Sequence, residues 1–370
     1  MVDVAIVGGG LAGCSAAVQL AVAGHDVLLL EKKTYPVHKL CGEFLSPEVK
    51  GALQRLEVLR DVEEAGAHPM HRTRITASNG TAFDAPLPGT AIGFSRYRLD
   101  PMLFARAAAC GADVRDGTMV RSVEGSLDEG FTLITRTETF QARVVLGAYG
   151  KRGVLDRTLD REAMQQHRPY VGFKAHFRGA DLEDVIELHA FDGGYCGMSH
   201  VEDGLVNACW ITHEDTLKAA DRSPEGMIAQ TFQTNPHLRA RFEKLERVSD
   251  SFCAVSQVSV QPKTTFEGDV CMIGDTAGMI APMCGDGMAM ALRSAELVAP
   301  HVDTFLRGAC TAEAFRSGYT ADWHAEFGTR MRVGRWAHHA YIRPWVAKAG
   351  LAVCQALPFL ARWVIRNTRG

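Results

Sequence analysis

The chain of 370 residues lacks several features that would place it in a specialised class of protein. None of its ten cysteines lies in a C-x-x-C pair, which argues against a zinc site or a disulfide framework and favours a reducing compartment. No uncharged apolar run reaches 18 residues, so the sequence predicts no membrane span. The formal net charge is only −3, which argues against bulk affinity for nucleic acid. Because the first residues already form a predicted strand, they leave no room for a signal segment, and we expect a cytoplasmic protein.

Glycine, by contrast, is concentrated near the start of the chain, in "VGGGLAG". A predicted buried strand precedes this stretch, a helix follows it, and a second strand ends at Glu31. Gly8, Gly10 and Gly13 fit G-x-G-x-x-G, in which the glycines permit a tight turn, close approach of a pyrophosphate and close packing of helix on strand. The phosphates would lie at the helix N-terminus, where free N–H groups favour anions. Glu31 can accept a hydrogen bond from an adenosine ribose hydroxyl, which favours FAD or NAD over NADP.

A second glycine-rich loop follows the apolar run "DVCMIG" and opens a long predicted helix. Asp275 ends the strand, where its carboxylate can bond a ribityl hydroxyl. The glycines allow backbone N–H groups to approach a pyrophosphate or a flavin ring. The alternative interpretation is a helix cap built from small residues.

Three separated segments resemble the para-hydroxybenzoate-hydroxylase-like flavoproteins, which include aromatic hydroxylases, flavin halogenases and geranylgeranyl reductases. "VGGGLAGCSAA…LLLE" resembles their FAD adenosine site, "GDVCMIGDTAGMIAPMCGDGMAMAL" their flavin-ribityl motif, and "SRYRLDPMLFARA" their R-x-x-L-D segment. In that superfamily the arginine corresponding to Arg98 lies near the FAD phosphates. The resemblance implies non-covalent FAD and no metal. The cofactor-binding residues that we expect are Gly8, Gly10, Ala12, Gly13, Glu31, Lys32, Lys39, Cys41, Gly42, Arg98, Gly274, Asp275, Pro282, Gly285, Gly287 and Met288.

Within the superfamily, "HKLCGEFLSPE" resembles the K-x-C-G segment of geranylgeranyl reductases, where the cysteine lies beside the isoalloxazine ring. "GYCGMSHVEDGLVN" resembles the strand pair that walls their substrate cavity. "GEFLSP" resembles a halogenase stretch, but no W-x-W-x-I-P occurs, which counts against a halogenase. The candidate catalytic residues are Cys41, beside the ring, and Glu43, which could supply a proton or orient a substrate. The alternatives are a small buried thiol for Cys41 and a solvated or capping role for Glu43.

In "GAYGKRGVLDR", Tyr149 stands where hydroxylases usually carry aspartate in G-A-D-G. In the family that aspartate helps to position a motif shared by FAD and NAD(P)H binding. The change puts direct reduction by NAD(P)H in doubt, so the electron donor stays open between NAD(P)H and a protein. The histidines at 176, 189 and 200 are interpreted as mainly structural.

We therefore predict an FAD-dependent oxidoreductase that reduces a C=C bond in a hydrophobic small molecule of isoprenoid, lipid or polyketide type. Two alternatives stay open. One is a flavin monooxygenase that hydroxylates an aromatic or polyketide substrate, and the other is a non-catalytic flavin- or lipid-binding protein.

The predicted fold is α/β, with a Rossmann-like FAD-binding domain of the glutathione-reductase and para-hydroxybenzoate-hydroxylase type, an inserted sheet-rich substrate domain and a helical C-terminal tail. The size and 46% hydrophobic content allow more than one domain. The predicted divisions are FAD-binding segments at 1–75, 95–165 and 263–305, a substrate-domain hairpin at 76–94, the mainly β substrate domain at 166–262, and the helical region at 306–370.

The tail has a charge pattern of its own, because no acidic residue follows Glu326. Basic residues alternating with aromatic ones suit an interfacial helix on the inner face of an anionic membrane, and the alternative is a helical cap packed on the substrate domain. The run "AGLAVCQALPFLA", with Pro358, is too short to span. The pattern consists of Arg330, Arg332, Arg335, Arg343, Lys348, Arg362, Arg366 and Arg369, interleaved with Trp336, Tyr341, Trp345, Phe359 and Trp363.

Overall fold

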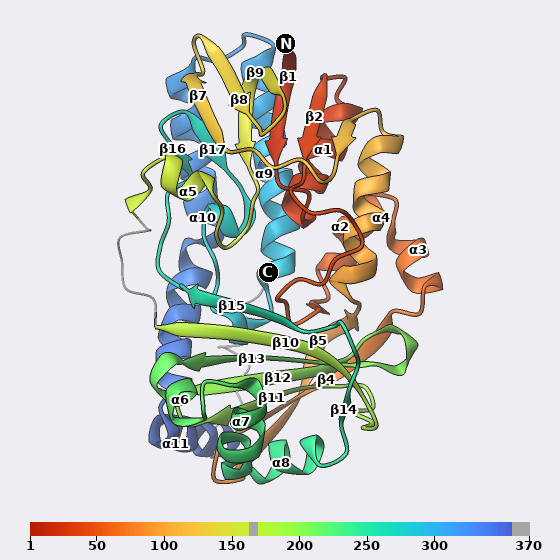
Figure 1. The fold of residues 1–370 in the computed structure, drawn as a ribbon, viewed down its shortest axis with the longest axis vertical. Helices are drawn as coiled ribbons and strands as arrows, with labels where there is room; N and C mark the ends of the chain where they lie inside the picture. The colour runs from red at the N-terminus through yellow and green to blue at the C-terminus, as the bar shows by residue number, and fades with distance from the viewer. Residues whose placement is uncertain (163–168, 357–370) are drawn as a thin grey trace.

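The computed structural model describes residues 1–162 and 169–356, which form two sheets at opposite ends of the molecule, with long helices running between them (Figure 1). The sheet that contains the N-terminal strand is called sheet A. It has eight strands in the order β16-β17-β9-β1-β2-β6, with the hairpin β7-β8 attached to β9. Its strands are β1 (Val2–Val7), β2 (Val27–Leu30), β6 (Asp113–Arg115), β7 (Ser122–Ser126), β8 (Gly130–Ile134), β9 (Thr139–Gly147), β16 (Phe266–Glu267) and β17 (Val270–Met272).

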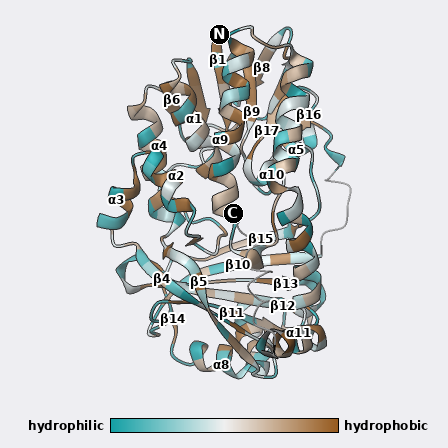
Figure 2. Cartoon of the chain, turned by 180° about the vertical axis from the view of Figure 1, so that it is seen from behind, coloured by the Kyte–Doolittle hydropathy of each residue, from teal (hydrophilic) through white to brown (hydrophobic). Residues whose placement is uncertain are grey.

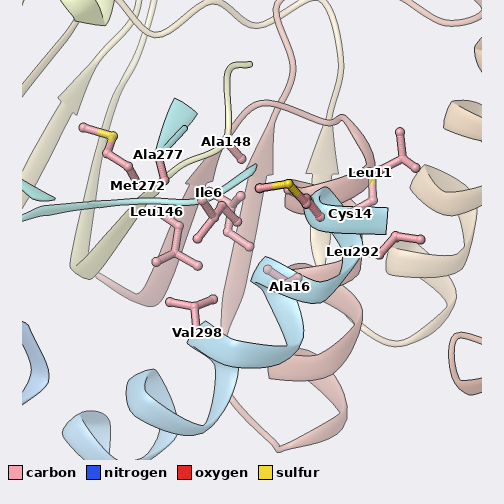
Figure 3. Close-up of a cluster of buried hydrophobic side chains, with 14 of the residues drawn as sticks. Ile6, Leu11, Cys14, Ala16, Leu146, Ala148, Met272, Ala277, Leu292 and Val298 are labelled. Carbon is pink, nitrogen blue, oxygen red and sulfur yellow. The ribbon is translucent and has the colours of Figure 1, made fainter. Parts of the chain in front are cut away.

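The centre of sheet A is parallel and buried on both faces. β1 pairs in parallel with β2 and β9, and its residues 4–7 are buried. Continuous apolar strands of this kind need helices on their faces, and α1 (Leu11–Val22) and α9 (Gly287–Leu306) supply one layer. Figure 3 shows Ile6 and Leu146 of the strands with Ala16 of α1 and Val298 of α9 in one apolar cluster.

Sheet B has nine strands in the order β14-β10-β13-β12-β11-β4-β5-β3, with β15 also paired to β10. The hairpin that we expected at 76–94 consists of β4 and β5, and it begins at His68, so residues 68–75 lie in sheet B rather than in the FAD-binding part. The strands are β3 (Phe44–Leu45), β4 (His68–Thr76), β5 (Ala82–Gly93), β10 (Tyr170–Arg178), β11 (Val185–Phe191), β12 (Gly194–His200), β13 (Val206–His213), β14 (Glu246–Arg247) and β15 (Cys253–Val258).

One face of sheet B packs on a separate apolar cluster that includes Phe173, Trp210 and Phe232. Short helices after β13 cover this cluster, so the segment expected to be mainly β also carries helical turns. In Figure 2 the strands at the centre of sheet A are brown, whereas teal residues gather on the outer helices, as expected for buried strands and solvated helix faces. The remaining helices outside the C-terminal region are α2 (Val49–Arg55), α3 (Leu59–Glu64), α4 (Arg96–Ala109), α5 (Leu155–Thr158), α6 (Glu214–Ala219), α7 (Pro224–Gly226) and α8 (Pro236–Phe242).

The C-terminal helices α10 (Ala312–Tyr341) and α11 (Pro344–Ala356) join the two ends of the molecule. Phe315, Tyr319, Trp323 and Phe327 recur every four residues of α10 and are buried, which gives the helix an apolar stripe towards the core. At its end the Tyr341 hydroxyl lies 3.0 Å from two sheet B carbonyls. The inner side of this helix is therefore packed. None of the helices in the described part of the chain combines the length and apolar character that crossing a bilayer requires.

The predicted α/β fold, with its nucleotide-type sheet, second sheet-rich part and helical C-terminal region, is confirmed. The tail residues expected from Phe359 onward, including Arg362, Arg366 and Arg369, lie outside the described residues.

Candidate functional site

A cavity of about 290 Å³ lies between the glycine loops of sheet A and one face of sheet B. Its residues come from segments far apart in sequence, so the site exists only in the folded chain. The first loop contributes Gly10, Leu11 and Ala12, the second Asp275, Pro282, Gly285, Gly287 and Met288, and sheet B contributes Ile75, Ile186, Leu188, Gly197, Cys209 and Ile211.

The first glycine loop has the shape that a dinucleotide pyrophosphate needs. Gly8 has φ +116°, and a Cβ there would lie 2.4 Å from the Ala148 carbonyl oxygen, so only glycine fits. A Cβ on Gly13 would lie 1.9 Å from the carbonyl oxygen of Gly8, because helix and strand pack closely there. No side chain caps the N-terminus of α1. Its N–H groups are therefore free to bind phosphate.

Glu31 ends β2 beside this loop and is buried. Its carboxylate accepts hydrogen bonds from the N–H of Gly9 at 2.8 Å and of Lys33 at 2.9 Å. Lys39 lies 3.8 Å from Glu31 and forms a shorter ion pair, 2.8 Å, with Asp100. Glu31 therefore fixes the loop, and its role at a ribose stays a prediction.

Seven of the expected cofactor-binding residues do not line the cavity: Gly8, Gly13, Glu31, Lys32, Lys39, Arg98 and Gly274. Lys32 is exposed, and the Arg98 guanidinium bonds the Ala65 carbonyl at 3.2 Å and Asp203 at 2.5 Å. The Arg98 guanidinium is therefore held away from the cavity, and its place beside the cofactor phosphates stays a prediction.

Arg96, in contrast, lines the cavity. Its guanidinium forms a 2.5 Å ion pair with Asp100 and lies next to Gly10, whose added Cβ would be 3.4 Å away. Residues two apart on a helix face different sides, so Arg96 and Arg98 of α4 cannot both face the cavity. The spacing of R-x-x-L-D, counted back from Asp100, already indicated Arg96.

The second loop meets the first across the cavity. Gly274 has φ +59°, and a Cβ there would lie 2.9 Å from the Cβ of Ala12. Gly285, with φ +69°, precedes α9, which also starts without a side-chain cap. The N-terminal N–H groups of α9 are thus available to the pyrimidine end of a flavin. Both loops fit FAD.

Asp286, which precedes α9, is fully buried but does not itself line the cavity. Arg330 donates to its Oδ2 at 3.4 Å. Burial and the neighbouring Glu48 carboxylate together raise the pKa of Asp286 to about 8. Asp286 is therefore largely protonated at neutral pH.

Cys41 and Glu43 lie together at one end of the cavity, and both line it. The Cys41 sulfur accepts from the N–H of Glu43 at 3.4 Å, and the Cys41 carbonyl accepts from Asn207 of β13 at 3.1 Å. Glu43 has φ +53°, a left-handed conformation that costs free energy for a non-glycine residue and recurs at functional sites. Glu43 is fully buried, so its solvated alternative is wrong.

Two side chains of β10 lie behind Glu43 and contact its carboxylate, although neither lines the cavity: Lys174, which the sequence analysis did not single out, and His176, which it interpreted as structural. Lys174 lies 3.0 Å from Glu43 Oε1, and His176 lies 2.5 Å from Glu43 Oε2. The Nδ1 atom of His38 lies 3.2 Å from the Lys174 ammonium. Burial alone would raise the pKa of Glu43, but the His176 hydrogen bond and the Lys174 charge hold it below its usual range. Glu43 is thus a carboxylate, and a proton delivered here has to come through its neighbours.

The other two histidines of sheet B have structural partners. His189 contacts Glu187 at 3.1 Å and Thr76 at 2.8 Å, and His200 accepts from the N–H of Leu182 at 3.0 Å. Of the three histidines interpreted as structural, His176 is therefore the one that reaches the candidate site.

The segment around Tyr149 still carries a carboxylate, that of Asp156, seven residues after Tyr149. The Tyr149 hydroxyl donates to Asp156 at 3.1 Å, and the buried Arg161 donates to Asp156 at 3.1 Å and to the Thr276 carbonyl at 3.0 Å. This network ties the segment to the second glycine loop. Asp156 thus keeps an acid beside the loop although position 149 has none.

Two uncapped helix N-termini, meeting beside an acid at the end of β2 and an apolar cavity, define an FAD-dependent oxidoreductase. The chain belongs to the FAD binding domain family, which matches residues 1–325, and the expected resemblance is confirmed.

Curated relatives cover most of the chain at low identity. Digeranylgeranylglycerophospholipid reductase 2 of Methanopyrus kandleri is 24% identical over 89% of this chain and 84% of its own. Menaquinone reductase of Mycolicibacterium smegmatis is 27% identical over 96% of this chain and 85% of its own. Conditioned medium factor receptor 1 of Dictyostelium discoideum is 24% identical over 98% of this chain and 75% of its own.

Solved structures share the fold. The flavin-dependent brominase Bmp2 has a TM-score of 0.82 at 19% identity and covers 99% of this chain and 93% of its own. The myxobacterial chondrochloren halogenase CndH has a TM-score of 0.80 at 21% identity and covers 92% of this chain and 83% of its own.

Proposed function

We propose that this protein uses FAD to reduce a C=C bond in the isoprenoid chain of a lipid. The observation that carries the proposal is the apolar wall of the cavity beside the two glycine loops. Ligand cavities that take up hydrophobic molecules are lined in this way, with few polar groups. The apolar wall consists of Ile75, Ile186, Leu188, Ile211, Val258, Met279 and Ile280.

Cys41 and Glu43 are two of the polar groups in the lining, which also includes Thr73, Arg96, Lys151, Glu187, Tyr195 and Asp275. On the same face of sheet B, Ser199 and Asn207 are paired in register, and each has a buried side-chain oxygen without a partner in the described part of the chain. Buried oxygens of this kind usually have a hydrogen-bond partner. We assign the chain of the substrate to the apolar wall; Ser199 and Asn207 lie next to the cavity-lining pair Gly197 and Cys209 but do not line the cavity themselves.

The relatives support the lipid assignment. One is named for a phospholipid with geranylgeranyl chains and another for menaquinone. Once bound and reduced, FAD would supply the hydride for the C=C bond. The residues of the chain then have three tasks: Cys41 packs at the ring, the N–H groups of α9 stabilise negative charge, and the Lys174–His176 pair brings a proton to the Glu43 end of the cavity.

Anaerobic reoxidation tests this proposal. The holoenzyme is reduced with dithionite and mixed with a geranylgeranyl lipid under argon. We expect the flavin to reoxidise without oxygen and the product to gain two hydrogen atoms by mass spectrometry. Cys41→Ala should slow this step more than it weakens substrate binding.

Two other outcomes would overturn the proposal. Reoxidation that requires oxygen and adds an oxygen atom to the substrate identifies a monooxygenase. Substrate binding without any change in the rate of reoxidation identifies a binding protein. Reduction by NADPH and by dithionite, compared in the same apparatus, decides whether NADPH is the direct electron donor.

A further inference from the structure

The outer side of the C-terminal helices carries large apolar side chains that nothing in the described structure covers. Trp336 of α10 is 67% exposed and Trp345 of α11 is 72% exposed. The other described tryptophans, Trp210 and Trp323, are 2% exposed. We call this surface the C-terminal face, and define it by Arg332, Trp336, Arg343, Trp345, Lys348 and Val353.

Helical spacing places these residues on one side of each helix. On α10, Trp336 follows Arg332 by four residues, whereas Ala337 and Tyr341 on the other side are buried. On α11, Trp345, Lys348 and Val353 are exposed, whereas Ala347 and Leu351 are buried. Each helix therefore packs on the protein with one side and presents an aromatic and basic side outward.

The charge of the C-terminal face is uncompensated. No ion pair joins Arg332, Arg343 or Lys348 to a carboxylate within the part of the chain that the structure describes. Arg330, which lies two residues before Arg332, pairs with Glu326 at 2.9 Å. No acidic residue follows Glu326 in the sequence. A positive surface that also exposes tryptophan suits an anionic lipid headgroup layer, where the indole ring is partly buried and the cations meet phosphates.

We propose that the C-terminal face docks the protein onto an anionic lipid surface. Ala337, the residue after Trp336, lines the cavity, so the same turn of α10 faces the lipid on one side and the substrate site on the other. In Figure 1, α11 lies at the end of the molecule that holds sheet B. Docking would therefore bring the membrane close to the apolar wall of the cavity. The inference rests on exposed side chains and holds whatever reaction the flavin performs.

Vesicle binding by the full-length holoenzyme tests the proposal without any substrate. We expect binding to equimolar phosphatidylcholine and phosphatidylglycerol vesicles, weaker binding to phosphatidylcholine alone, and release by salt. R332Q/R343Q/K348Q should lose on the order of 100-fold in affinity, because each basic residue near such a surface contributes about a factor of five. W336S/W345S should lose roughly tenfold or more for both kinds of vesicle.

Matched controls come from distant exposed positions. Arg60→Gln and Val22→Ser, whose side chains are 88% and 71% exposed, should bind vesicles as the wild type does. Flavin content shows whether each variant is folded. Quenching of wild-type tryptophan emission by brominated lipids needs no substitution and should occur only with vesicles that bind.

Three results would overturn the proposal. The wild type could bind anionic vesicles no better than neutral ones, or the folded variants could bind as well as the wild type. A dimer that dissociates in W336S/W345S, with no vesicle binding by the wild type, would assign the face to a second copy of the chain.

Discussion

The ammonium group of Lys174 lies 3.0 Å from the carboxylate of Glu43, and neither side chain is exposed. The two residues come from different parts of the fold, a loop before β3 and strand β10. Burying such a pair costs desolvation free energy. Removing one partner destabilises the fold further, because it leaves a lone charge in the interior. The pair therefore holds the loop of Cys41 against sheet B.

Lys174→Met should lower the free energy of unfolding by about 3–5 kcal/mol, because it leaves Glu43 charged and without its ammonium partner. The double variant Glu43→Gln/Lys174→Met should recover a large part of that loss. Urea unfolding of the holoenzyme measures both variants together with Glu43→Gln alone. If the effects of the two single substitutions simply add, the residues are not coupled.

Arg96 and Arg98 provide a matched pair for testing the cofactor site. Arg96→Gln should weaken FAD binding roughly 10- to 100-fold, because a charged hydrogen-bond donor beside Gly10 contributes about 1.5–3 kcal/mol. Arg98→Gln, which removes contacts to Ala65, Glu202 and Asp203, should leave FAD affinity within about twofold. Equilibrium titration of the apoprotein with FAD measures both affinities. If Arg98→Gln weakened FAD binding more than Arg96→Gln, Arg98 would be the arginine beside the phosphates.

The sequence could predict the parts of the site that depend on local geometry. The glycine loops and Glu31 belong to a strand, helix and strand that follow one another directly, so their spacing specifies the turn and the end of the strand. The R-x-x-L-D spacing, counted back from Asp100, indicates Arg96, which lines the cavity. Arg98, in contrast, lies two residues along the helix and faces Ala65 and Asp203.

Lys174 and His176 could not be predicted in the same way. Alternation along β10 shows that they share a face of the strand, but not that this face meets the loop of Glu43, more than 130 positions earlier. That contact depends on how sheet B packs against the FAD-binding part. Asp156 is a similar case, because its role follows from the approach of Arg161 to the second glycine loop.

Asp286 should give the protein a pH-dependent stability near neutrality. Its pKa is raised from 3.8 to about 8 in the folded protein. At pH values between these two, the folded state therefore keeps a proton that the unfolded state has released. The free energy of unfolding should therefore fall as pH rises through this window, by at most about 1.4 kcal/mol per pH unit.

Asp286→Asn should remove this contribution, so its stability relative to the wild type should increase from pH 5 to pH 8. Glu48 and Arg330 face Asp286 and remain in both proteins, so the difference between the two curves isolates this one group. Urea unfolding at four pH values measures it, with the exposed Asp128→Asn as a control. A difference that does not vary with pH would mean that Asp286 is ionised in the folded protein.

Gly197 allows the apolar wall to be tested without disturbing the cofactor. It lies on β12 in the cavity lining, and a Cβ there would meet nothing closer than the Cys209 carbonyl oxygen at 3.8 Å. Valine is favoured in strands, so Gly197→Val should fold and keep its flavin.

The methyl groups of the introduced valine would occupy space that we assign to the isoprenoid chain, and overpacking by a few carbons costs about 1–3 kcal/mol. We expect the dissociation constant of the prenyl substrate to rise about tenfold for valine and less for alanine, while FAD affinity stays unchanged. Anaerobic substrate titration of the oxidised holoenzyme measures this series. Equal substrate affinity in Gly197→Val and the wild type would show that the chain does not lie along sheet B, and a loss of flavin would place Gly197 in the cofactor site instead.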